Sequence, residues 1–116
     1  MSERPLQRWL DRADALGAEG RFFEAHEELE EAWKAASGAE KTLLQGLIQV
    51  AAGLHRLRLG GDRAGADYLL ARGREKLRAN GTLLEPAGLA ALESSLDALR
   101  ASGSAPESLR FGLRAR

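Results

Sequence analysis

The sequence contains no cysteine and no excess of charge of either sign. Without cysteine the chain cannot carry a disulfide framework, a thiolate zinc site or a cysteine nucleophile. Its 17 Lys and Arg residues are balanced by 17 Asp and Glu residues. A neutral protein lacks the basic excess with which nucleic-acid binders displace counterions from phosphates. We therefore expect neither a disulfide-rich protein nor a dedicated nucleic-acid binder.

Long apolar segments are absent as well. No run approaches the roughly 20 apolar residues that cross a membrane. The opening Met-Ser-Glu-Arg-Pro also lacks the apolar centre of a signal peptide. These absences predict a cytoplasmic protein without a membrane segment. Aromatic residues make up only 5% of the 116 residues, whereas hydrophobic residues reach 44%. A core of leucine and alanine favours closely packed helices over a β-sandwich.

Apolar residues recur at three- and four-residue spacing between glycine-rich breaks, which predicts about five helices. The expected helices cover about residues 5–16, 21–36, 37–59, 63–79 and 86–101. Ser37 and Glu40 fit a capping box at the start of the third helix, and Asp62 is the expected N-cap of the fourth. The third helix carries two adjacent apolar rows, so we expect it to lie at the centre of the molecule.

The expected fold is all-α: a compact bundle of two helical hairpins, weakly similar to tetratricopeptide repeats, followed by a C-terminal helix. We expect residues 1–101 to form one domain and residues 102–116 to form a linker and a mobile tail. The tail is either one more helical turn around Leu109 and Phe111 or a frayed end. Gly73 costs its helix about 1 kcal/mol relative to alanine, which indicates that a neighbouring helix approaches closely there.

The most distinctive stretch is residues 21–33, in which His26 lies among glutamates. Positions three, four or seven apart share one face of a helix, so His26 shares a face with Phe22, Glu30 and Trp33. Glu27 lies about 100° around the helix from His26. On the next long helix, three polar residues are expected to form the opposite wall of a pocket: Gln45, Gln49 and His55.

This pocket has two interpretations. An imidazole and a carboxylate suit zinc, iron or manganese, so His26 and Glu30 are candidate metal ligands. Two ligands do not hold a catalytic metal, and a third must come from the opposite wall or from another subunit. Glu27 is then the candidate general base. Alternatively, His26 is a hydrogen-bonded structural residue, and the aromatic residues beside it are core or interface anchors.

Two blocks of sequence resemble a family of small, all-helical prokaryotic proteins of unknown function. The first block is Phe-Glu-Ala-His-Glu-Glu-Leu-Glu-Glu-Ala-Trp, residues 23–33, and the second is Leu-Gln-Gly-Leu-Ile-Gln-Val-Ala-Ala-Gly, residues 44–53. The resemblance covers about residues 9–78. Some members carry the label of a predicted metal-dependent hydrolase, which implies a site at His26, Glu27 and Glu30 but states no reaction.

Two functions of different classes follow. The favoured one is a dimerising interaction module without catalysis, in which histidine, glutamate and glutamine side chains form a structural polar cluster. It rests on the wide apolar face of the third helix and on the opposite charges of the acidic second helix and the basic third and fourth helices. The alternative is a metal-dependent hydrolase that binds zinc, manganese or iron. Nucleic-acid binding is a third and less favoured function, because the net charge is zero.

Overall fold

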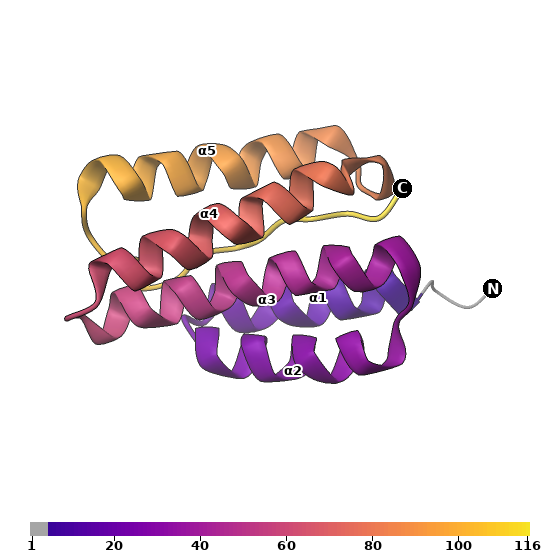
Figure 1. The fold of residues 1–116 in the computed structure, drawn as a ribbon, viewed down its shortest axis with the longest axis horizontal. Helices are drawn as coiled ribbons and strands as arrows, with labels where there is room; N and C mark the ends of the chain where they lie inside the picture. The colour runs from indigo at the N-terminus through magenta and orange to yellow at the C-terminus, as the bar shows by residue number, and fades with distance from the viewer. Residues whose placement is uncertain (1–4) are drawn as a thin grey trace.

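The computed structural model describes residues 5–116. Five helices account for most of these residues (Figure 1). They follow the predicted order and lie close to the predicted positions. The first four residues of the expected domain lie outside the described residues. The helices are α1 (Pro5–Ala18), α2 (Phe22–Ala35), α3 (Gly38–Leu59), α4 (Arg63–Ala79) and α5 (Pro86–Ser102), with a 3₁₀ turn, η1 (Gly81–Leu83), before the last. The expected all-α fold is confirmed.

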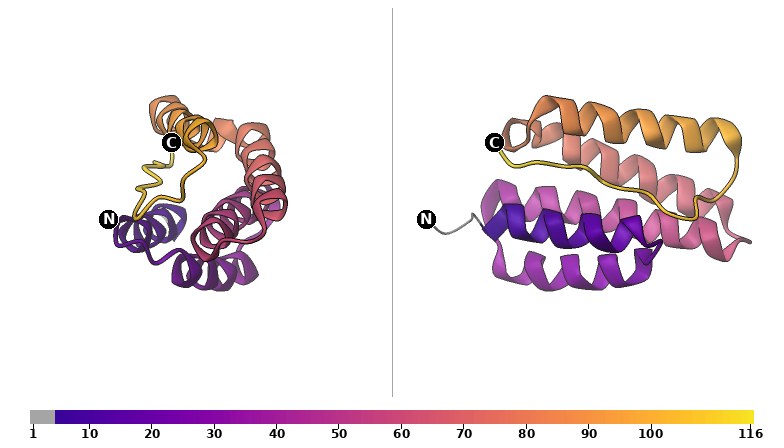
Figure 2. Two further views of the ribbon diagram at one scale, coloured as in Figure 1. Left: turned by 90° about the vertical axis from the view of Figure 1, so that its left-hand side faces the viewer. Right: turned by 180° about the vertical axis from the view of Figure 1, so that it is seen from behind.

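Helices that are neighbours in the sequence pack on one another, most extensively α3 with α4 and least extensively α4 with α5. The pairs α1–α2 and α3–α4 are the two expected hairpins. Seen end-on, the helices form an open arc from α1 round to α5, and the C-terminal segment lies in the opening of the arc (Figure 2). No helix in the part of the chain described is long and apolar enough to cross a membrane.

The central position expected for α3 is confirmed, because α2 and α4 cover its two sides. Most residues of its two apolar rows are buried, and together the rows contribute six core residues: Leu43, Leu44, Leu47, Val50, Ala51 and Leu54. Burying a leucine or valine side chain contributes roughly 1.5–3 kcal/mol. These rows therefore hold the two hairpins together.

Glycines bring α3 and α4 into direct backbone contact. A Cβ atom at Gly73 would lie only 2.5 Å from the carbonyl oxygen of Gly46, and a Cβ at Gly46 would lie 2.9 Å from the carbonyl oxygen of Gly73. A Cβ at Gly53 would lie 3.1 Å from the carbonyl oxygen of Ala66. The close approach predicted from Gly73 is confirmed, and the glycine on the facing helix makes it possible.

The two predicted helix caps have different outcomes. The Asp62 carboxylate accepts a hydrogen bond of 2.9 Å from the backbone N–H of Gly65, so the predicted N-cap of α4 is confirmed. Ser37 makes no side-chain capping bond at the start of α3, so the predicted capping box is wrong. Gly38 has a φ of +61°. This left-handed residue directs the chain into α3 by a route that does not bring the Ser37 hydroxyl to the free N–H groups.

The segment after α5 is extended. It contains no helical turn around Leu109 and Phe111, so that alternative for the tail is wrong. Phe111 and Leu113 are buried against the helices, with 1% and 3% of their surface exposed. The signal was present in the sequence: apolar residues occupy every second position from 109 to 115, with arginine or glycine between them. A period of two residues is that of extended chain.

Ion pairs connect α4 to α5. Arg74 of α4 lies 2.8 Å from Asp97 and 3.1 Å from Glu93 of α5, and Arg78 also binds Glu93. Arg74 and Glu93 are mostly shielded from solvent, with side chains 14% and 21% exposed. The hydrogen bond from Arg78, together with that from Arg74, outweighs partial burial and holds the pKa of Glu93 below its ordinary value.

We expect the substitution Glu93→Gln to lower the free energy of unfolding at pH 7 by about 1–2 kcal/mol, because it leaves Arg74 without its shielded partner. Folding lowers the pKa of Glu93, so its stabilising effect is complete above the ordinary value of 4.5 and is lost as the pH falls through the lower native pKa. Urea unfolding of the original protein and of Glu93→Gln between pH 7 and pH 3 measures how the difference in their free energies of unfolding changes with pH. Glu75→Gln, which removes an exposed pair with Arg72, is the control. A stability difference between Glu93→Gln and the original protein that does not change with pH contradicts the expectation.

Candidate functional site

The predicted pair of His26 and Glu30 is formed on α2. The imidazole Nε2 lies 2.7 Å from the Glu30 Oε1 atom. The other nitrogen, Nδ1, is buried and has no hydrogen-bond partner among the described residues. In a neutral imidazole one nitrogen donates and the other accepts, so this geometry places the proton on Nε2 and leaves Nδ1 as the bare acceptor.

Phe23 joins this pair to α3. Its ring stacks on His26 with ring centroids 5.9 Å apart, and it contacts His55 of α3 with centroids 5.2 Å apart. A pocket of about 210 Å³ lies between the two helices and is lined by these three rings, Ala52 and Arg56. A neighbouring hollow shares Phe23 and His55 and extends to Leu59. We call Phe23, His26, Ala52, His55 and Leu59 the Phe23 face.

The remaining candidates on α2 lie elsewhere. Glu27 is exposed and lines a separate acidic hollow on the outside of α2 with Glu24, Glu28 and Glu31. Phe22 belongs to the core, being only 1% exposed. Trp33 is half-buried, and the ammonium group of Lys41 lies 4.1 Å from the centroid of one of its rings.

The two glutamines do not form the expected wall opposite His26. Gln49 accepts a hydrogen bond of 2.9 Å from the Lys76 ammonium group of α4, and Gln45 is exposed. Gln49 lies three and four positions from Gly46 and Gly53, so it shares the side of α3 that packs on α4. The wall opposite His26 consists instead of Ala52 and His55.

The donor set does not fit a catalytic metal ion. Among the described residues, no group of three or more His, Asp or Glu side chains is placed to hold one. His26 offers no accessible nitrogen, because Nε2 binds Glu30 and the unpartnered Nδ1 is closed off from solvent. A catalytic zinc site needs three protein ligands and an open position. We therefore assign no metal to this pair.

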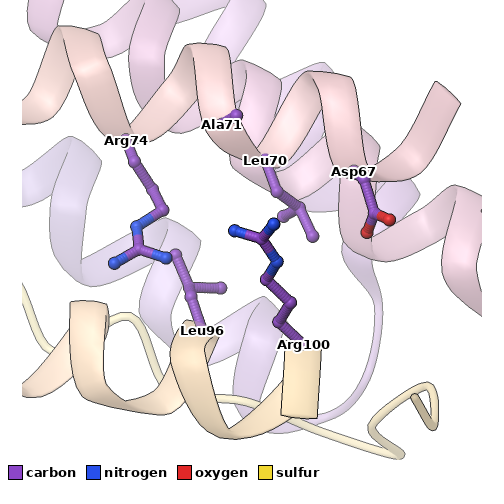
Figure 3. Close-up of a pocket in the computed structure, with 6 residues that line it drawn as sticks. All are labelled: Asp67, Leu70, Ala71, Arg74, Leu96 and Arg100. Carbon is purple, nitrogen blue, oxygen red and sulfur yellow. The ribbon is translucent and has the colours of Figure 1, made fainter. Parts of the chain in front are cut away.

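A further cavity, of about 120 Å³, lies between α4 and α5 (Figure 3). Leu70, Ala71 and Leu96 form its apolar part, and Asp67, Arg74 and Arg100 contribute charged groups. Arg74 already pairs with Glu93 and Asp97. The charge of Arg74 is therefore compensated within the protein.

Sequence reasoning missed Phe23 as a member of the site, although its position three residues before His26 places it on the same side of α2. The exposed fraction of its side chain, 48%, is unusual for a phenylalanine. The arrangement as a whole is a half-exposed aromatic surface supported by an internally bonded histidine.

The family resemblance is supported by comparison with known proteins. A family model described as "Domain of unknown function (DUF309)" matches residues 10–68, which include both sequence blocks that carry the resemblance. No curated protein matches the chain. No solved structure matches it.

Proposed function

The chain belongs to the family described as a domain of unknown function (DUF309), so its function must be inferred from its geometry. We propose that the protein is a cytoplasmic helical interaction module that forms a homodimer through the Phe23 face. The observation that carries the proposal is the exposed aromatic side chain of Phe23 beside two hollows on α2 and α3.

Two large apolar side chains lie on this face. Phe23 is 48% exposed and Leu59 is 71% exposed, and both line the same hollow with His55. Adjacent exposed apolar groups on a soluble protein are typical of interaction sites, and large aromatic side chains that fill a pocket contribute most of the binding energy at interfaces. A partner that covers Phe23 and fills the hollows removes this surface from water.

Charge supports a second copy of the chain as that partner. Glu30 borders the face on α2, where it binds His26, and Arg56 lines its pocket on α3. A two-fold axis parallel to the helices places α2 of one protomer over α3 of its partner, so the glutamate of each face meets the arginine of the other. Such exposed pairs contribute only about 0–1 kcal/mol each, so they set the orientation while the apolar groups provide the affinity.

In this proposal the histidine has a structural role. The hydrogen bond from Nε2 to Glu30 fixes the His26 ring, and the ring then supports Phe23 from one side. His55 contacts Phe23 from α3. An anchor that is already held in place loses less conformational entropy when a partner binds.

The test is the molar mass in solution as a function of protein concentration, measured by light scattering or sedimentation. Removal of the anchor in Phe23→Ser is expected to weaken the dimer about 10- to 100-fold. Tyr68→Ser is the matched control, because Tyr68 is a 64% exposed aromatic residue on α4, outside the Phe23 face. An original protein that stays monomeric at millimolar concentration, or equal effects of the two substitutions, contradicts the proposal.

A further inference from the structure

The opening of the helical arc is filled by the chain's own C-terminal segment. Residues 107–116 run as extended chain between α1 and α5 (Figure 2). The side chains of Phe111 and Leu113 enter the core, and those of Leu109 and Ala115 are partly buried against it. Arg110, Arg114 and Arg116 lie on the exposed side. The segment therefore binds the helices as an extended peptide binds a groove.

The walls of this groove have no side chain where the segment passes closest. A Cβ atom at Gly17 of α1 would lie 2.5 Å from the carbonyl oxygen of Leu109, and a Cβ at Gly88 of α5 would lie 2.6 Å from that of Gly112. At Gly20 a Cβ would collide with the carbonyl oxygen of Glu107. Glycines on both walls thus make room for a peptide backbone.

Polar groups of α1 bind that backbone. The side-chain oxygen of Gln7, a residue only 8% exposed, accepts a hydrogen bond of 2.7 Å from the N–H of Ala115. Asp14 accepts one of 2.9 Å from the N–H of Gly112, and its second oxygen binds the Arg110 guanidinium at 2.9 Å. Any extended peptide can donate main-chain N–H groups to these oxygens. The Asp14 carboxylate, in contrast, selects for a basic residue at the position of Arg110.

The ends of the groove add main-chain pairing. The N–H of Leu109 donates to the carbonyl oxygen of Gly17 at 2.9 Å. At the other end, Glu85 donates to the carbonyl oxygen of Arg114 at 2.8 Å, and Arg116 donates to that of Leu83 at 2.9 Å. All these partners lie on α1 or in the turn before α5, so none of the bonds depends on the covalent link through residues 103–106.

We propose that the groove between α1 and α5 is a binding site for an extended segment of another protein, with apolar residues at alternate positions and arginines between them, and that residues 107–116 are its tethered occupant. A short flexible linker gives a tethered ligand an effective concentration in the millimolar range. A partner segment therefore enters the groove only when it outcompetes the chain's own segment.

The test uses the full chain and a fluorescent peptide of residues 106–116, with anisotropy as the readout. Phe111→Ala weakens the tethered segment by deleting its largest buried side chain, and we expect this variant to bind the peptide at least 50-fold more tightly than the original protein does. Leu113→Ala is a second, milder variant, for which we expect a smaller gain. A Gly88→Val substitution added to either variant closes the groove and abolishes binding. A peptide with glutamate in place of its arginines binds at least 10-fold more weakly.

The outcomes that overturn the proposal are specific. One is that neither tail variant, folded by circular dichroism, binds the peptide. Another is that binding survives Gly88→Val, which places the peptide elsewhere. A third is that the original protein forms dimers whose labelled tails exchange between chains, because this assigns the groove to a second copy. Phe23→Ser removes the anchor of the Phe23 face and leaves the groove intact. If a tail variant that also carries Phe23→Ser still binds the peptide, the groove acts independently of the proposed dimer.

Discussion

Replacing Phe111 with alanine is expected to lower the free energy of unfolding by about 3–5 kcal/mol, as is usual for a fully buried phenylalanine. The side chain is only 1% exposed, and its ring lies so near α1 that a Cβ atom at Gly17 would be 3.0 Å from it. The effect is large because helices pack on their neighbours in the sequence, so α1 and α5 have little to replace the ring. Urea unfolding followed by circular dichroism measures it.

Phe23→Ala is the matched control for this prediction. It deletes the same side chain from a position that is 48% exposed, so its effect on the free energy of unfolding of the monomer is expected to be below about 1.5 kcal/mol. Equal losses for the two variants, or a loss below about 1 kcal/mol for Phe111→Ala, would show that the segment after α5 is not part of the core.

Gly73→Ala is expected to destabilise the protein by about 2–4 kcal/mol, although alanine is the better helix former by about 1 kcal/mol. The added Cβ atom would lie 2.5 Å from the carbonyl oxygen of Gly46 and 2.7 Å from a methyl group of Val50. The first of these neighbours is backbone and cannot rotate away, so α3 and α4 must move apart. That separation loosens the packing of both helices along their length.

Gly81→Ala provides the comparison. A Cβ atom at Gly81 would meet only the end of the Leu89 side chain, at 3.5 Å, which is an ordinary van der Waals contact. Its effect on the free energy of unfolding is expected to lie within about 1 kcal/mol of zero. Equal stabilities of Gly73→Ala and Gly81→Ala in thermal or urea unfolding would show that the packing of α3 on α4 does not require glycine at position 73.

The helices were predictable because their apolar residues recur at helical spacing and because glycines mark their ends. The start of α4 at Arg63 was predicted from the N-cap residue Asp62 that precedes it. The path of residues 103–116 was not predicted. A two-residue alternation predicts extended chain, but it does not say which surface the chain covers, and that surface exists only after five helices have assembled into an arc.

The candidate site was likewise predicted only in part. Spacing along one helix predicted that His26 and Glu30 meet, and they do so at 2.7 Å. Spacing does not give the rotation of one helix relative to the next, so Gln49 was expected opposite His26 although it binds Lys76 of α4. The glycines at positions 46 and 73 set that rotation by bringing one particular side of α3 against α4.

The extended segment also has a consequence for the order of folding. Contacts within each helical hairpin join residues close in sequence, whereas the bonds from Asp14 to Gly112 and from Gln7 to Ala115 span 98 and 108 residues. Closing such long loops is entropically costly, so local pairs form first and distant ones last. The hairpins then assemble before the segment docks, and the docked segment acts mainly as a barrier to unfolding. Its apolar residues therefore control how long the native state lasts more than how fast it forms.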